Sequence, residues 1–222
     1  MSARHPEETG IAVIGLGRFG SRLADSLSRL GYEVLAIDHD AGRVQHWSAD
    51  LDRVVQADTT EEAVLRQLGL ADFRRVVVAI GASLEASVLT VLALAELGIE
   101  QIWARATSEK HAKILHSVGA HHVVFPEQET GERVAHLIVS RMLDFIEFDD
   151  DFAIAKIKVP APLVGRSLRD IAPQDRYGVM VVGEKQAGEP FRYVGPDTVL
   201  KADSVLIVEG GISQVQRFSA VT

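Results

Sequence analysis

Residues 11–20, IAVIGLGRFG, decide the fold. The apolar run before Gly15 is typical of a buried parallel strand, and the three glycines follow the G-x-G-x-x-G spacing. Gly15 and Gly17 allow a sharp turn and a close approach of backbone N–H groups to phosphate, whereas Gly20 allows the next helix to pack close to the strand. The N-terminus of that helix offers unpaired amides and a partial positive charge to an anion. The stretch therefore predicts a phosphate-binding turn between a strand and a helix.

A second signal follows about 20 residues later, where a predicted strand over 33–38 ends in Asp38. A carboxylate at this place would accept hydrogen bonds from ribose hydroxyls, which favours a ribose without a 2′-phosphate. Asp58, in QADTTEEAV, follows the third predicted strand and has two interpretations. It would lie beside an adenine pocket, or it would cap the helix that follows. The sequence GAS at 81–83, after the fourth predicted strand, is expected to line the same cleft.

Arg18 is unusual inside such a turn, because the helix amides already serve a pyrophosphate. Its guanidinium would suit a further phosphate, or a ligand held by a neighbouring subunit; the alternative is a solvated residue on the first helical turn. Phe19 belongs to the same turn and is included among the candidate cofactor-binding residues, although packing explains an aromatic side chain here better than ligand binding does.

The first two thirds of the chain alternate between strand-like and helix-like segments, which predicts an α/β fold: a Rossmann-like, doubly wound parallel sheet. Short runs rich in Val and Ile predict six strands, at 11–15, 33–38, 53–57, 76–81, 101–105 and 122–125. Helical periodicity predicts helices at 20–30, 84–97 and 108–118, the last with Ser108 as its N-cap.

The pattern changes after residue 125. Residues 130–145 are predicted to form one long helix with an apolar stripe, followed by the acidic FDDD and an alternating strand at 153–159. Short strands near 179–183, 191–194 and 205–209 are separated by turns rich in Pro and Gly. The sequence therefore predicts two domains: residues 1–146 with the nucleotide-binding sheet, and residues 147–222 as a small C-terminal α+β domain.

Composition excludes several classes of function. The 222 residues have a formal net charge of −8, which disfavours a nucleic-acid partner because such a partner selects a basic surface. There is no cysteine, so disulfides and thiolate metal sites are excluded. No signal peptide or membrane-length apolar run is apparent, which leads us to expect a cytoplasmic protein. The eight histidines are scattered without metal-binding spacing.

Several stretches resemble a known family: AVIGLGRFG, VLAID, VVVAIGASLEASVLTVLALAELGI, IWARA and GAHHVVFPEQETGERVA. They are similar to the regulatory subunits of bacterial potassium uptake systems, of the KtrA type and more distantly the TrkA type, which contain the RCK (KTN) domain. The likeness covers about residues 10–145 and continues more weakly to the end, where it resembles the small TrkA-C (RCK_C) module. The most specific motifs are GLGRFG and FPE.

The resemblance implies a regulatory subunit rather than an enzyme. Such proteins form dimers that assemble into an octameric ring on the cytoplasmic face of an integral-membrane potassium-translocating subunit. The family binds ATP, ADP or sometimes NAD(H), and exchange of ATP for ADP alters the ring.

By matching position, the resemblance assigns the phosphate turn to the three glycines and the ribose contact to Asp38. It implies that Arg18 reaches the γ-phosphate bound by the partner subunit, and that Arg105 faces the same cleft. Glu127 would lie near a divalent cation, Mg²⁺ or Ca²⁺, bound with ATP. A strand-end salt bridge remains open for Arg105, and a plain surface position for Glu127.

Two further points remain open. Some family members bind cyclic di-AMP through an asparagine and an arginine in the C-terminal module, but this chain has Ala172 and Gln174 at those positions. The competing function is a small NAD-dependent oxidoreductase, or an NADH-sensing regulator, which would use the same turn and the same Asp38. The C-terminal residues offer no Tyr–Lys pair or His–Asp dyad for such chemistry.

Overall fold

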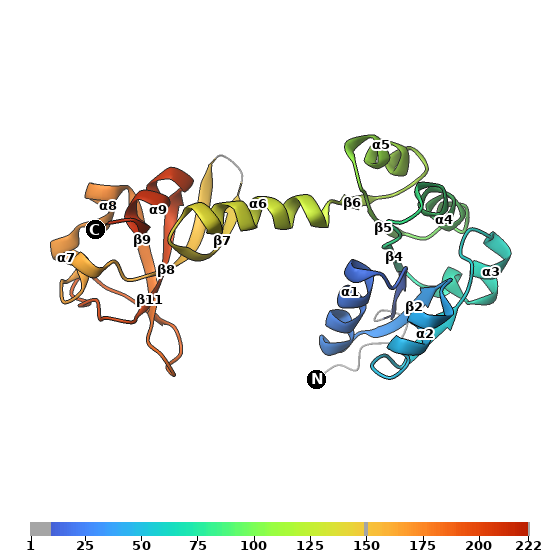
Figure 1. Ribbon diagram of the computed structural model, residues 1–222, viewed down its shortest axis with the longest axis horizontal. Helices are drawn as coiled ribbons and strands as arrows, with labels where there is room; N and C mark the ends of the chain where they lie inside the picture. The colour runs from blue at the N-terminus through green and yellow to red at the C-terminus, as the bar shows by residue number, and fades with distance from the viewer. Residues whose placement is uncertain (1–9, 149–150, 222) are drawn as a thin grey trace. The chain divides into compact units, whose positions relative to one another are not determined.

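The computed structural model describes residues 10–148 and 151–221. The chain forms two compact units, Met1–Glu127 and Gln128–Thr222, each with its own β-sheet (Figure 1). Among the described residues, no helix is both long enough and apolar enough to cross a membrane.

The first unit alternates strands and helices. Its elements are β1 (Gly10–Ile14), α1 (Arg18–Arg29), β2 (Glu33–Asp38), α2 (Ala41–Trp47), β3 (Arg53–Gln56), α3 (Glu62–Gln67), the 3₁₀ turn η2 (Leu70–Asp72), β4 (Arg75–Val78), α4 (Leu84–Glu96), β5 (Gln101–Arg105), α5 (Glu109–Ser117) and β6 (His122–Val124). All six predicted strands are present, and the helices predicted at 20–30, 84–97 and 108–118 correspond to α1, α4 and α5. Helix α2 was not predicted.

The six strands form one parallel sheet in the order β3-β2-β1-β4-β5-β6. Alternate residues of each central strand enter two different cores, because successive side chains point to opposite faces. In β1, Ala12 and Ile14 pack in the core with α3, α4 and α5, whereas Ile11 and Val13 pack in the core with α1. This doubly wound arrangement confirms the predicted Rossmann-like fold.

Helix boundaries in this unit follow local capping chemistry. The hydroxyls of Ser83 and Ser108 accept hydrogen bonds from the backbone N–H groups of Ala86 (3.1 Å) and His111 (3.2 Å), and so begin α4 and α5. Gly98 and Gly119 follow the two helices with positive φ, which glycine adopts without steric cost. The N-cap role predicted for Ser108 is therefore confirmed.

The second unit is an antiparallel sheet with small helices. Its elements are β7 (Met142–Phe148), β8 (Phe152–Lys158), η3 (Ala161–Leu163), α7 (Leu168–Ile171), α8 (Pro173–Tyr177), β9 (Val179–Lys185), β10 (Arg192–Tyr193), β11 (Val205–Gly211) and α9 (Ile212–Ser219), in the sheet order β10-β9-β11-β8-β7. Val215 and Phe218 of α9 are buried in one core with Ile157 of β8 and Leu206 of β11.

The prediction of a single long helix over 130–145 is wrong. The structure has the helix α6 (Pro126–Val139), followed by strand β7. Met142 and Phe145, which fitted the helical stripe, are buried in the second core, and β7 pairs with β8 from Met142 to Phe148, with a shift of register between Met142 and Asp144. This antiparallel pairing with the next strand determines the strand, because the apolar spacing at 134–146 fits both periods.

The boundary expected at 146/147 also differs from the structure, which divides at 127/128. A cut after Ile146 would pass through β7 and separate Glu147 and Phe148 from the rest of a strand. Since β7 is hydrogen-bonded to β8 and contributes two residues to the second core, it belongs to the C-terminal unit.

One charged residue in the second unit has a buried side chain. Glu184 of β9 is fully buried, and its Oε2 accepts a hydrogen bond from Nη2 of Arg192 at 3.0 Å. Burial acts to raise the pKa of Glu184, but Ser204 and Arg192 beside it lower the pKa more, so it falls below its usual value. The pair therefore stabilises the unit fully at pH values above the usual pKa of a glutamate. This contribution is lost as the pH falls through the lowered pKa of Glu184 in the folded protein.

We expect Arg192→Ala to destabilise the C-terminal unit by about 1–3 kcal/mol at pH 7, because it leaves a buried carboxylate unpaired. Without Arg192, the pKa of Glu184 should be higher than in the wild-type protein, so the loss shrinks as the pH falls and the carboxyl is protonated. Urea unfolding at several pH values measures both effects. The control is Arg169→Ala, which breaks the exposed pair with Asp197 and should cost below about 1 kcal/mol. Equal losses in the two variants, independent of pH, would contradict this interpretation of Glu184.

Candidate nucleotide-binding site

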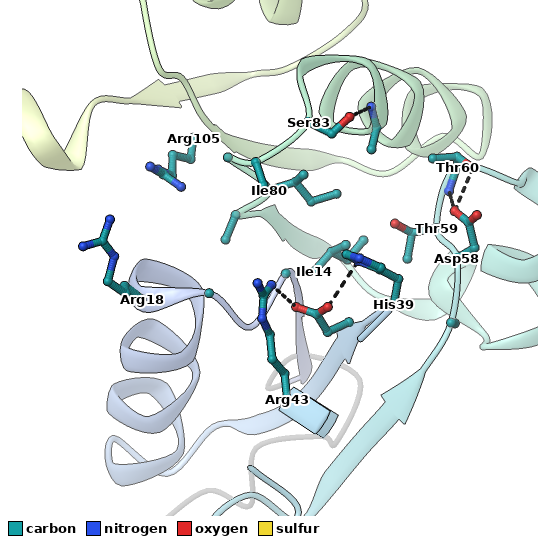
Figure 2. A pocket seen from close by; sticks show the side chains of 18 residues that line it. Ile14, Arg18, His39, Arg43, Asp58, Thr59, Thr60, Ile80, Ser83 and Arg105 are labelled. Atoms are coloured by element: carbon teal, nitrogen blue, oxygen red, sulfur yellow. Dashed lines mark hydrogen bonds and ion pairs between the residues drawn. The ribbon is translucent and has the colours of Figure 1, made fainter. Parts of the chain in front are cut away.

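A cavity in the first unit lies at the carboxyl ends of the parallel strands. It has a volume of about 540 Å³ and is lined by the ends of β1, β2, β3, β4 and β5, together with the first turns of α1 and α4 (Figure 2). The strand order reverses between β1 and β4, and open α/β sheets bind ligands in the crevice at such a switch point. The sheet topology therefore creates the site.

The three glycines have three different physical roles. Gly15 has φ +97°, and a Cβ there would lie 3.1 Å from the backbone carbon of Ala79. At Gly20 a Cβ would overlap the Gly15 carbonyl oxygen and lie 2.8 Å from Cβ of Ala79. At Gly17, which lines the cavity, a Cβ would meet no protein atom within 4 Å. Gly15 and Gly20 are thus required by the fold, whereas only a ligand would require Gly17.

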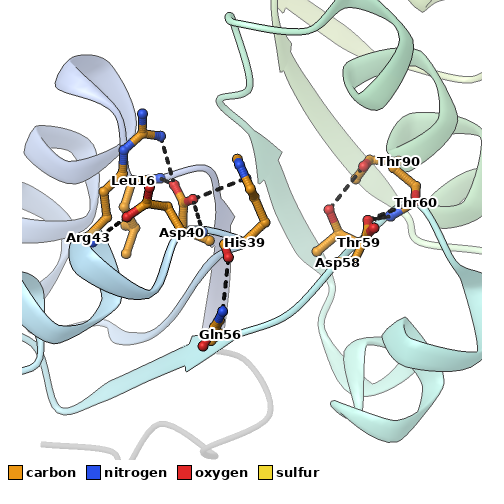
Figure 3. A network of polar contacts seen from close by, with 10 residues as sticks. Leu16, His39, Asp40, Arg43, Gln56, Asp58, Thr59, Thr60 and Thr90 are labelled. Carbon is orange, nitrogen blue, oxygen red and sulfur yellow. Dashed lines mark hydrogen bonds and ion pairs between the residues drawn. The ribbon is translucent and has the colours of Figure 1, made fainter.

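Asp38 lines the cavity and is almost fully buried. Its Oδ2 accepts the backbone N–H of Leu16 at 2.6 Å, and its Oδ1 accepts the backbone N–H of Asp40 at 2.9 Å (Figure 3). The carboxylate therefore ties the end of β2 to the glycine-rich turn, a structural role that the sequence did not reveal.

Two further side chains contact the carboxylate oxygens of Asp38. Nη1 of Arg43 lies 3.3 Å from Oδ2, and Nδ1 of His39 lies 3.3 Å from Oδ1. Both line the cavity, and the His39 side chain is 79% exposed, so a ribose hydroxyl could replace either contact. Neither was predicted; the only sequence signal for Arg43 is a basic residue shortly after the strand-end aspartate.

Asp58 lines the cavity but does not cap a helix, because α3 begins after Glu61. Instead its Oδ1 accepts hydrogen bonds from the backbone N–H of Thr60 (3.0 Å) and from the Thr60 hydroxyl (2.7 Å). These bonds lower the pKa of Asp58, so the side chain is a carboxylate at neutral pH. Of the two interpretations of the sequence, the capping role is wrong.

Arg18 is exposed, lines the cavity and, within the described part of the chain, forms no ion pair. In Figure 2 it lies with Arg105 at one end of the cavity, and Asp58 and Thr60 lie at the other. Phe19 is half-buried and is not among the cavity-lining residues that the structure describes. The turn therefore presents one free guanidinium to the cavity.

Arg105 joins the cavity to the start of α6. Its guanidinium lies across the backbone of Gly81, where a Cβ would overlap it, and the side chain is 18% exposed. Nη2 and Nε of Arg105 donate to the two carboxylate oxygens of Glu127 at 2.6 and 3.3 Å. The salt-bridge interpretation of Arg105 is thus correct, and the same side chain also lines the cleft together with Gly81–Ser83, as predicted.

A metal ligand set made by this chain alone is not present in the described ranges, which contain no group of three or more His, Asp or Glu side chains suited to a metal. Glu127 supplies one carboxylate, which is compatible with Mg²⁺ because Mg²⁺ is usually held by one or two carboxylates together with substrate phosphates. Any cation at Glu127 would have to compete with Arg105 for the carboxylate.

A doubly wound sheet with a glycine-rich turn and a strand-end aspartate defines a Rossmann-type nucleotide-binding protein. Residues 11–126 match the TrkA-N domain and residues 152–221 match the TrkA-C domain. The chain belongs to the TrkA family of two-module proteins, as its motifs indicated.

Relatives and solved structures agree with this assignment. The chain is 38% identical over 208 residues to the Ktr system potassium uptake protein C of Bacillus subtilis, covering 93% of this chain and 94% of that protein. The crystal structure of the GsuK RCK domain matches 96% of this chain with a TM-score of 0.65 at 19% identity, which concerns the fold alone. GsuK bound to ADP matches 60% of this chain with a TM-score of 0.51 at 28% identity. This chain spans 48% and 34% of those two solved chains.

Proposed function

We propose that this protein is a nucleotide-binding regulatory subunit of a potassium uptake system and not an enzyme. The observation that supports this most is the cavity over the glycine-rich turn, found in a chain that is similar over 93% of its length to a Ktr potassium uptake protein. The identity of the transported ion, potassium, is inferred from that similarity alone and not from any residue of the cavity.

The ligand of the cavity is an adenine nucleotide, ATP or ADP, with NAD(H) as a second candidate. GsuK, which this chain matches at 28% identity, has been crystallised with ADP. The helix amides and Gly17 would hold the first phosphates, and Asp38 would hold the ribose. Arg18, exposed and unpaired among the described residues, would bind the terminal phosphate of ATP held by a partner subunit. ADP lacks that phosphate, so the two nucleotides would favour different states of the assembly.

A divalent cation, Mg²⁺ or Ca²⁺, would accompany ATP near Glu127. The contact between Arg105 and Glu127 gives this proposal a specific form. A phosphate in the cavity offers Arg105 another anionic partner, which would release the Glu127 carboxylate for the cation. Binding of triphosphate and cation would then be cooperative, because each removes a competitor of the other.

The assembly is a homo-oligomer, a dimer that builds an octameric ring, attached to an integral-membrane potassium-translocating subunit at the cytoplasmic face. Helix α6 has exposed apolar side chains, Val134 at 45% and Ile138 at 77%, which supports a contact between protomers. Light scattering with and without nucleotide tests the ring. A monomer at all concentrations would contradict it.

The competing function is a small NAD-dependent oxidoreductase or an NADH-sensing regulator, and a thermal-shift experiment distinguishes the candidates. A regulatory subunit should be stabilised by ADP, and by ATP with Mg²⁺ or Ca²⁺, because ligands that bind only the folded state raise the melting temperature. Stronger stabilisation by NADH than by any adenine nucleotide, together with hydride turnover, would favour the enzyme and contradict our proposal.

A further inference from the structure

The carboxylate of Asp38 is already occupied by groups of the protein itself. Each carboxylate oxygen can accept about two hydrogen bonds. Oδ2 accepts the backbone N–H of Leu16 at 2.6 Å and lies 3.3 Å from Nη1 of Arg43. Oδ1 accepts the backbone N–H of Asp40 at 2.9 Å and lies 3.3 Å from Nδ1 of His39. A ribose hydroxyl can therefore reach Asp38 only by displacing one of these four groups.

His39 is the group that a ribose hydroxyl displaces most easily. The two backbone N–H groups belong to the turn and to the end of β2, and they make the two shortest contacts. Arg43 carries a permanent charge, and its side chain is 45% exposed. The side chain of His39 lines the cavity, is 79% exposed and can lose its charge. The contact between His39 and Asp38 is thus the weakest of the four when the imidazole is neutral.

The strength of this contact depends on the protonation of His39. Histidine is the side chain whose charge ordinarily changes between about pH 5 and 8. A protonated imidazole 3.3 Å from the Asp38 carboxylate makes a charge-assisted contact, which is stronger than the contact of a neutral ring. A ribose hydroxyl has no charge, so its own contact with Asp38 does not gain strength in the same way.

The surroundings of His39 are mostly acidic. Besides Asp38, the carboxylates of Asp40 at the start of α2 and Asp58 after β3 interact electrostatically with the His39 ring. Arg43 of α2 is the cation that lies nearest on the other side, and both close-up views show His39 between Arg43 and Asp58 (Figures 2 and 3). Three carboxylates therefore attract an imidazolium here, which keeps it beside the cavity.

We propose that His39 competes with the ribose hydroxyls of the nucleotide for the carboxylate of Asp38, and that protonation of His39 strengthens the competitor. As the pH falls, more of the protein carries the imidazolium, so the ribose hydroxyls contribute less to the affinity. By linkage, displacement of His39 by the ribose releases protons. This inference rests on the proposed function, in which the cavity holds a ribonucleotide.

The test compares ADP with 2′,3′-dideoxy-ADP by calorimetry on the full-length chain, at about pH 8 and about pH 6. The two ligands carry the same phosphates, so the titration of those phosphates and their attraction to a charged His39 cancel in the affinity ratio. The wild-type protein should prefer ADP about tenfold at the higher pH, because a hydrogen bond to a charged acceptor contributes about that much. At the lower pH the preference should fall to about threefold or less.

Two variants separate charge from hydrogen bonding. His39→Asn keeps a neutral N–H donor near the position of Nδ1 but cannot be protonated, so the preference for ADP should be the same at both pH values. The exposed side chain makes this variant tolerable to the fold. His46→Asn is the matched control: His46 is exposed on α2 beside Trp47 and is not among the described residues that line the cavity. It should retain the pH dependence of the wild type.

A second measurement needs no variant. Binding enthalpies measured in buffers with different ionisation enthalpies count the protons released. At about pH 6.5, where an ordinary histidine is half protonated, ADP should release more protons than dideoxy-ADP does. Equal proton release by the two ligands would contradict the competition.

The outcomes distinguish the two proposals. A preference for ADP that is the same at both pH values in the wild type, or that falls equally in His39→Asn, would overturn the role of His39 while leaving a nucleotide-binding subunit intact. Equal affinities for the two ligands at the higher pH would overturn it too, because no ribose hydroxyl would then contact Asp38. Absence of binding by both ligands at both pH values would overturn the proposed function and this inference with it.

Discussion

Gly17→Ala is expected to weaken adenine-nucleotide binding by about 30-fold or more while leaving the melting temperature of the free protein unchanged or slightly raised. Gly17 has φ −67° and ψ −171°, which alanine adopts without strain, and a Cβ there meets no protein atom within 4 Å. The methyl group would instead occupy space that a phosphate needs at the turn, and such overlap costs about 1–3 kcal/mol. Calorimetry with ADP and thermal unfolding without ligand measure the two quantities.

Gly20→Ala is the matched control for this prediction. Its Cβ would overlap the Gly15 carbonyl oxygen and press on Ala79, so the variant should lose folding stability, by about 1–3 kcal/mol or more. The two substitutions are chemically identical and three positions apart, yet one should affect binding and the other folding. Unimpaired nucleotide binding by Gly17→Ala would show that the phosphates lie elsewhere.

The second large effect is expected from Arg18→Ala, which should weaken ATP binding by about 30-fold and ADP binding by less than about threefold. Arg18 is exposed and has no ion pair within residues 10–148 and 151–221, so its removal should not disturb the fold. A charge-assisted, bidentate contact with a terminal phosphate contributes about 1.5–3 kcal/mol. Calorimetry with each nucleotide, in the presence of Mg²⁺, gives the two losses.

Arg22→Ala is the control for charge alone. Arg22 is exposed one turn further along α1 and is not among the cavity-lining residues that are described. It should leave the affinities for ATP and ADP within about twofold of the wild type, because screening weakens the effect of an exposed charge at that distance. Equal losses for ATP and ADP in Arg18→Ala would count against recognition of the γ-phosphate.

The parallel sheet was predictable because its strands are buried on both faces and stand out as Val- and Ile-rich runs, such as 11–15 and 101–105. Strand β7 was not, since Met142 and Phe145 fit a helical stripe as well as a strand. The antiparallel pairing of β7 with β8, the next strand along the chain, decides between the two. The domain boundary was predicted incorrectly, at 146/147 instead of 127/128, for the same reason.

The site was predictable where a single backbone or charge requirement determines the residue, as for Gly15 and for the strand-end Asp38. The bond between Asp38 and the Leu16 N–H, and the contact of Arg43 with that carboxylate, could not be predicted. Both contacts depend on how β1, β2 and α2 are positioned relative to one another, which the spacing of residues in the sequence does not specify. The two hydrogen bonds from Thr60 to Asp58 likewise follow from the local conformation of the chain.

The most direct test of the central claim is the ratio of the ATP and ADP affinities of the unaltered protein, measured by calorimetry at a fixed Mg²⁺ concentration. The account predicts that ATP binds at least about tenfold more tightly, because only ATP offers a γ-phosphate to Arg18. Equal affinities would contradict it, because the γ-phosphate would then contribute no binding free energy through Arg18.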